Sequence, residues 1–269
     1  MPVFYDTHAH LGYPDFADEL PQVVERARSA GINRIVTIAT DAETSHRALQ
    51  IADQFPDVFA VVGWHPCDIA TAPEDIRPTL RELAQHPKVV ALGETGLDYH
   101  RLPSQKPEFT PADAERYKSK QAAIFRQHLD IAAELGLNCV IHQRDAFEDT
   151  VAILEPYAKA VRGVFHCFAD DAVAMRRVVE LGSIVSFTGI LTFKNAQTIR
   201  DTLAQTSLEK FMLETDSPFL APVPYRGKRC EPAYVKEISQ VAAQVKGCSL
   251  DELSQATCAT AESFFKRFN

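Results

Sequence analysis

The sequence predicts an α/β protein of the TIM-type (β/α)8 barrel class, regular or distorted, and three observations lead to this prediction. Short apolar runs typical of buried strands occur eight times along the chain. Segments with helical periodicity alternate with them, which favours parallel strands joined by right-handed crossovers. The chain has 269 residues, and such barrels occupy about 250 residues as one domain. An open doubly wound sheet is the alternative, and we expect residues 1–269 to form a single domain.

The predicted strands and helices alternate throughout the chain. Apolar residues three and four positions apart indicate helices within residues 20–27 and 124–135. Gly31 and Gly136 follow these segments as predicted C-caps, and Pro111 opens the second helix. The eight predicted strands are Val3–Tyr5, Arg34–Ala39, Phe59–Val62, Val89–Leu92, Cys139–Ile141, Gly163–Phe165, Ile184–Phe187 and Lys210–Leu213.

Two stretches, residues 98–110 and 217–231, lack either periodicity. Both follow strands that carry candidate functional residues. Long loops at the carboxyl edge of a barrel usually form the wall of its active site. We therefore expect these two loops to border a site.

The composition excludes several classes of protein. Hydrophobic residues make up 46% of the chain, which is typical of a globular protein with a large core. The net charge is −8. No apolar run is long enough to span a bilayer, and the opening residues do not resemble a secretory signal, so we expect a cytoplasmic protein. The negative charge argues against broad nonspecific attraction to nucleic acid but permits a local basic patch. The six cysteines lack CxxC spacing, which favours reduced, mostly buried thiols.

Metal-binding residue types follow five of the predicted strands. His8 and His10 follow the first, and four single residues follow later ones: Glu94, His142, His166 and Asp216. The carboxyl ends of parallel strands meet at one edge of the sheet, where α/β enzymes present groups to ligands. The pattern predicts a metal-dependent hydrolase.

Each residue also has a simpler interpretation when it is taken alone. His8 and His10 point to the same side of an extended chain, but a His-x-His pair is also common at surfaces. Glu94 can bridge two cations through its two oxygens, or it can accept backbone hydrogen bonds in a turn. Asp98 fits the turn interpretation better.

Single histidines at strand ends, such as His142 and His166, are more often core residues than ligands, and it is their joint occurrence that favours a metal site. Neutral imidazole binds Zn, Mn, Fe or Ni, whereas Mg favours oxygen ligands. The histidine content thus indicates a transition-type ion or a mixed site.

The remaining polar residues suggest roles around the ligands. Asp216 would accept the proton from an activated water, as the general base, while Glu214 fits a supporting role. His65 is interpreted as a substrate-binding or supporting residue. The other four histidines, His46, His86, His100 and His128, are interpreted as surface or capping residues.

Basic residues cluster in the loop after the last strand. Arg226, Lys228 and Arg229 lie within four positions, and Arg144 lies two residues after His142. On an acidic protein such a cluster favours a phosphate-bearing substrate. The alternative is an ordinary solvated loop.

The chain resembles the TatD family of metal-dependent deoxyribonucleases, within the amidohydrolase-like metallohydrolases, over nearly its whole length. Together the matching motifs are highly specific. They are the segments 6–11 (DTHAHL), 63–66 (GWHP), 93–99 (GETGLDY), 142–146 (HQRDA), 166–168 (HCF), 213–218 (LETDSP) and 226–229 (RGKR).

The resemblance implies a TIM-type barrel with two or three metal ions and 3′ to 5′ exonuclease activity on DNA. It implies that His8, His10, Glu94 and Asp216 hold one divalent ion and that Glu94, His142 and His166 hold a second, with Glu94 bridging them; Zn, Mn or Mg are the candidate ions. Two positions depart from the family pattern: Ala9 replaces the usual Cys, and Cys230 replaces a frequent Asn. Neither is an implied ligand, although Cys230 puts contacts of the basic loop in doubt.

Three functions are therefore considered. The leading hypothesis is phosphodiester hydrolysis of nucleic acid, DNA in preference to RNA, by a protein that we expect to be monomeric. The second is an amidohydrolase-type enzyme that cleaves a C–N bond or a lactone on the same scaffold. The third is a catalytically silent binding module, against which the complete set of costly polar ligands argues.

Overall fold

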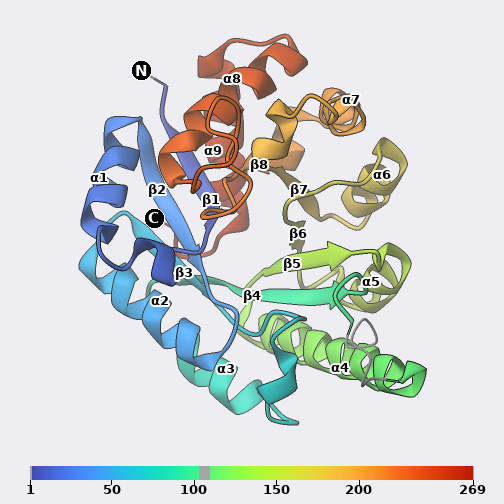
Figure 1. Ribbon diagram of the computed structural model, residues 1–269. Helices are drawn as coiled ribbons and strands as arrows, with labels where there is room; N and C mark the ends of the chain where they lie inside the picture. The colour runs from blue at the N-terminus through green and yellow to red at the C-terminus, as the bar shows by residue number, and fades with distance from the viewer. Residues whose placement is uncertain (1, 103–109, 269) are drawn as a thin grey trace.

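The computed structural model describes residues 2–102 and 110–268 and has eight parallel strands in the order of the sequence (Figure 1). The predicted barrel is confirmed, and the open doubly wound alternative is wrong, because each strand pairs with its neighbour in the chain. The strands are β1 (Phe4–Ala9), β2 (Ile32–Ile38), β3 (Val58–Val62), β4 (Val89–Asp98), β5 (Cys139–Arg144), β6 (Gly163–Phe165), β7 (Ile184–Phe187) and β8 (Phe211–Leu213).

The barrel is nearly closed by contacts between the first strand and the segment after the last one. The Asp216 N–H donates a hydrogen bond of 2.9 Å to the His8 carbonyl, and the His10 N–H donates one of 2.7 Å to Ser217. The Thr7 hydroxyl donates to Leu213 O at 3.0 Å. These bonds bring residues some 200 positions apart to the same edge.

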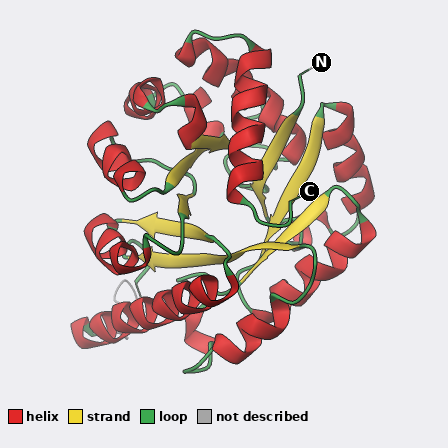
Figure 2. Ribbon diagram, turned by 180° about the vertical axis from the view of Figure 1, so that it is seen from behind, coloured by secondary structure: helices red, strands yellow, loops and turns green. Residues whose placement is uncertain are grey.

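Helices surround the strands, as the view from behind shows (Figure 2). Pro111 begins α4 and Gly136 ends it with a φ of 66°, so both boundary predictions are confirmed. The helices are α1 (Leu20–Ser29), α2 (Ala42–Gln54), α3 (Arg77–Leu83), α4 (Pro111–Leu135), α5 (Phe147–Leu154), α6 (Ala172–Glu180), α7 (Gln197–Gln205), α8 (Val235–Lys246) and α9 (Leu250–Phe264).

The interior of the barrel is an apolar plug that positions the site above it. Val140, Val164 and Met212 point inward and pack with phenylalanines from the end of α9, including Phe264 and Phe265. The alternate residues of the same strands, such as Ile141, pack outward against the helices. Because side chains alternate along a strand, the next inward positions on β5, β6 and β8 are occupied by His142, His166 and Glu214.

Several details differ from the sequence predictions. Strand β4 runs on to Asp98, so Glu94 lies within a strand and not after one, and α9 follows the eighth unit as an unpredicted helix. Residues 103–109 of the first irregular loop lie outside the described residues.

All six cysteines are free; two of them, Cys139 and Cys230, are buried, and the other four are half-buried. In the part of the chain that the structure describes, the helices are too short or too polar to cross a membrane.

Candidate metal centre

The first group of candidate ligands lies between β1 and the segment after β8. His8 Nε2 lies 3.3 Å from His10 Nε2 and 3.3 Å from Glu94 Oε2, and Asp216 Oδ1 lies 3.4 Å from His10 Nε2. Ligand bonds of about 2.0–2.1 Å to a tetrahedral zinc ion place ligand atoms about 3.3–3.4 Å apart. The spacing of this group matches that requirement.

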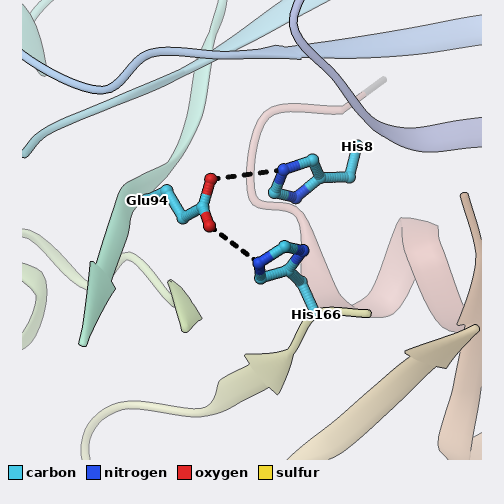
Figure 3. A group of neighbouring side chains, drawn as sticks. All are labelled: His8, Glu94 and His166. Atoms are coloured by element: carbon cyan, nitrogen blue, oxygen red, sulfur yellow. Dashed lines mark ion pairs between the residues drawn. The ribbon is translucent and has the colours of Figure 1, made fainter. Parts of the chain in front are cut away.

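The second group meets the other oxygen of the same carboxylate. Glu94 Oε1 lies 2.7 Å from His166 Nε2 and 3.0 Å from His142 Nδ1, and these two ring nitrogens are 3.2 Å apart. Figure 3 shows Glu94 between His8 and His166, with one oxygen directed to each ring. Each oxygen of this carboxylate thus faces a different imidazole, and the rings of His8 and His166 stack at 4.1 Å between centroids, so that the two groups adjoin.

Glu94 Oε2 provides a test of whether a cation fits here. The atom is buried and has no hydrogen-bond partner among the described residues. A buried carboxylate oxygen without a partner is costly. A divalent ion between Glu94 and the ring nitrogens would satisfy it, so the donor set fits a metal.

His65 joins the same cluster. Its Nε2 atom lies 3.4 Å from Glu94 Oε1, and its ring lies edge-on to that of His142 at 4.4 Å between centroids. Burial lowers the pKa of His65 to about 3, so the ring is neutral and able to donate a lone pair. His65, Glu94 and His142 form a third group with the geometry of a metal site.

Asp98 has a role that the sequence interpretation missed. Its Oδ1 accepts a hydrogen bond from the Arg101 N–H, as the turn interpretation expects, but Oδ2 also lies 3.1 Å from His142 Nε2. The carboxylate therefore holds the ring with Nδ1 directed at Glu94. The signal was present in the sequence, because Asp98 is four residues after Glu94 and an even spacing places both on one face of a strand.

Replacement of Asp98 by Asn is expected to weaken metal binding by about 10- to 100-fold, since partners that orient a ligating histidine have effects of this size. The amide keeps the shape but loses the negative charge beside His142. Titration of the ion-free protein with Zn²⁺ against a chromophoric chelator measures the change. Asp201→Asn, on the exposed face of α7, is the control, and equal affinity in the two variants would contradict this role.

Two further buried acids support the cluster from behind. Glu214 accepts a 2.7 Å hydrogen bond from the Cys167 N–H and lies 3.6 Å from His166 Nδ1. Asp6 accepts hydrogen bonds from both the N–H and the hydroxyl of Thr215. Burial is the main cause that raises the pKa of Asp6 to about 8. Asp6 thus holds the chain immediately before Asp216, a contact that its place in the segment 6–11 does not reveal.

The charges of the ligands depend strongly on one another. Burial alone would raise the pKa of Glu94, but His166, His65 and His8 outweigh it and hold that pKa well below its usual range. Burial would also raise the pKa of Asp216, yet His10 keeps it lowered. Both acids are therefore ionised. Burial lowers the pKa of His166, but the neighbouring Glu94 outweighs burial, and the resulting pKa of His166 is well above 6.5.

The raised pKa of His166 predicts a pH-dependent metal affinity. In the ion-free protein the imidazolium form stabilises the fold below pH 6.5, and this contribution is lost as the pH rises through the raised pKa. Metal ions bind neutral imidazole, so binding releases a proton. The apparent affinity for Zn²⁺ is expected to rise as the pH increases from 6.5 through the raised pKa of His166. The difference in Tm between loaded and chelator-treated protein should grow in the same direction, and a flat profile would contradict the expectation.

The four candidate phosphate-binding residues differ in their surroundings. Arg144 and Lys228 are exposed and have no ion pair with any described residue, and Arg226 stacks on Phe193 at 3.7 Å. Arg229 is different, because it binds Glu19 and Glu231 at 2.8 Å each. These two carboxylates already neutralise Arg229. It braces the loop against the rest of the barrel, and we leave it out of the substrate contacts.

The interpretation of His128 as a surface or capping residue is wrong. The side chain is fully buried, and its Nε2 accepts a 3.1 Å hydrogen bond from the Trp64 N–H while Nδ1 lies 2.9 Å from Ile124 O. Burial lowers its pKa to about 4, so the ring is neutral. His128 supports the chain segment that presents His65.

A barrel of this kind, with acids and imidazoles gathered around one carboxylate at the carboxyl ends of its strands, defines the class of metal-dependent hydrolases. Residues 5–266 match the family model described as TatD related DNase. The chain belongs to the TatD family of metal-dependent hydrolases.

Individual relatives agree with this assignment. The metal-dependent hydrolase YabD of Bacillus subtilis is 37% identical over 265 residues, covering 98% of this chain and 99% of the relative. A protein of Erwinia amylovora named 3′-5′ ssDNA/RNA exonuclease TatD is 32% identical, covering 97% and 99%. The crystal structure of the TatD homologue YJJV from Escherichia coli superimposes with a TM-score of 0.87 at 26% identity, covering 97% of each chain.

Proposed function

We propose that this protein is a nuclease that hydrolyses phosphodiester bonds of DNA and removes nucleotides from the 3′ end. The observation that carries the proposal is the position of Glu94, whose two oxygens face different imidazoles at 2.7–3.3 Å. A carboxylate that bridges two cations suits an in-line displacement at phosphorus, in which both the attacking and the leaving oxygen need stabilisation. The name of the Erwinia relative supports the same substrate class.

Six residues would hold two divalent ions, with Zn, Mn or Mg as candidates. His8, His10, Glu94 and Asp216 would hold the first, and Glu94, His142 and His166 the second. His65 lies close enough to Glu94 to contribute to the second group. When bound, such ions lower the pKa of water and polarise a phosphoryl oxygen.

The residues of the chain would divide the remaining work. Asp216, which is ionised and has a side chain 15% exposed, would take the proton from the attacking water. Asp98 would keep His142 in place. Arg144 and Lys228 would bind the phosphates that flank the scissile bond, since their charges are not neutralised by any described residue.

A substrate panel tests this proposal. Metal-depleted protein is reloaded separately with Zn²⁺, Mn²⁺ or Mg²⁺ and given labelled single-stranded DNA, duplex DNA, RNA, lactones and cyclic amides. Metal-dependent release of mononucleotides from the 3′ end supports the proposal. Turnover of a lactone or an amide with none of any nucleic acid would replace it by the amidohydrolase-type function.

A further inference from the structure

Phe219 is an exposed aromatic residue at the edge of the metal centre. Its side chain is 50% exposed, and among the described residues only Val173 and Val223 are comparable exposed large hydrophobics. Phe219 lies three residues after Asp216 in the loop that follows β8. A single exposed apolar side chain is common on protein surfaces, but this one contacts the ring of a candidate metal ligand, His10.

The ring of Phe219 extends an aromatic wall that begins at a candidate ligand. The His10 ring stacks on Tyr13 with 4.7 Å between centroids, and Phe219 stands edge-on to both, at 6.2 Å from His10 and 6.0 Å from Tyr13. The wall therefore leads from the first group of ligands towards solvent.

The loop holds Phe219 in a fixed position. The Phe219 N–H donates a 2.9 Å hydrogen bond to Asp216 O, and Pro218 O accepts one of 2.9 Å from the Cys230 N–H. Leu220, the next residue, has a φ of 55° and its carbonyl lies so close to Gly189 that a Cβ there would collide with it. A left-handed conformation in a residue other than glycine is costly and often marks a functional segment. The exposure of Phe219 is thus built into the loop.

From these observations, and resting on the proposed nuclease function, we infer that Phe219 is a stacking platform for an unpaired nucleobase next to the scissile phosphate. A nucleotide whose phosphate lies at the ligands carries its base one sugar away, and the Phe219 ring lies 6.2 Å from the ring of the candidate ligand His10. Every base offers a π face, so stacking binds single strands with little dependence on sequence. Bases inside a duplex are already stacked on both faces, so the platform favours a frayed or single-stranded end.

The test compares single-stranded oligonucleotides that differ in one base. One substrate carries natural bases, and two others carry an abasic nucleotide at the terminal or the penultimate 3′ position. In the wild type, kcat/KM is expected to fall by about 5- to 100-fold when the stacked base is missing. In Phe219→Ala this dependence on the base should disappear, because kcat/KM for the natural substrate falls to the value for the abasic one. Phe219→Trp should retain the dependence.

Matched variants separate stacking from other causes. Val223→Ala removes an equally exposed apolar side chain, 49% exposed, from the same loop and should leave the base dependence unchanged. Phe219→Leu keeps an apolar side chain without a ring and should behave like the alanine variant. If Phe219→Ala lowers kcat/KM equally on natural and abasic substrates, or leaves the base dependence undiminished, this inference is overturned while the proposed nuclease function stands. Absence of nucleic acid cleavage by the wild type with every metal would overturn the proposed function, and this inference with it.

Discussion

Asp216→Asn is expected to lower kcat by about 10²- to 10⁴-fold, the range for removal of a general base, while the protein stays folded and binds metal. Asparagine keeps the size of the side chain and one oxygen at the position of Oδ1, which lies 3.4 Å from His10 Nε2 and 3.6 Å from His8 Nε2. It cannot accept the proton, because the amide is not basic. The backbone bond from residue 216 to His8 O does not involve the side chain and is retained.

The measurement pairs single-turnover kinetics with metal analysis of the same preparation. Asp201→Asn, a distant exposed substitution on α7, should match the wild type in both. Full turnover in Asp216→Asn would remove the base assignment. Loss of metal together with activity would instead make Asp216 chiefly a ligand.

Glu94→Gln should have the largest effect on metal content. The carboxylate presents Oε2 to His8 and Oε1 to His142 and His166, and only a carboxylate can offer a lone pair in both directions. Glutamine has one oxygen, and its NH₂ group would face the other ion. We expect at least one of the two ions to be lost and kcat/KM to fall by about 10³-fold or more, because each such ion contributes several kcal/mol.

Metal stoichiometry by mass spectrometry and kcat/KM on single-stranded DNA measure this effect. Glu134→Gln is the control, since Glu134 is an exposed residue of α4 that pairs only with Arg81 among the described residues. The control should keep its metal and its activity. Two tightly bound ions in Glu94→Gln would show that Glu94 does not bridge them.

Much of the barrel could be predicted from local pattern. The strands Gly163–Phe165 and Ile184–Phe187 coincide with β6 and β7 at both ends, because strands buried on both faces are continuous apolar runs bounded by polar residues. Where a strand carries polar residues to the site, the pattern fails. Strand β4 continues through Glu94 to Asp98 because β5 pairs with it there, and that pairing is invisible in the apolar pattern.

The candidate ligands could be proposed from the sequence, but their arrangement could not. The positions of the candidate ligands after apolar runs identify His8, Glu94 and Asp216, since parallel strands direct their carboxyl ends to one edge. Among their neighbours, His65 was expected as a substrate-binding or supporting residue, whereas the contact of Asp98 with His142 was not expected. His65 and Asp98 contact residues of the cluster that are distant in the sequence. Arg229 is neutralised by Glu19, which is also distant in the sequence, and by Glu231, two residues away.

The sequence by itself determined the class of fold, the residue types able to bind metal and the apolar runs that precede them, because these follow from periodicities of two and 3.6 residues. Only the tertiary structure decided that the two oxygens of Glu94 face different imidazoles, that Asp98 orients His142 and that Phe219 stands exposed beside His10. The reason is physical: periodicity fixes the face of a strand on which a side chain lies, whereas distances between faces are set by closure of the barrel, which joins β1 to the segment after β8.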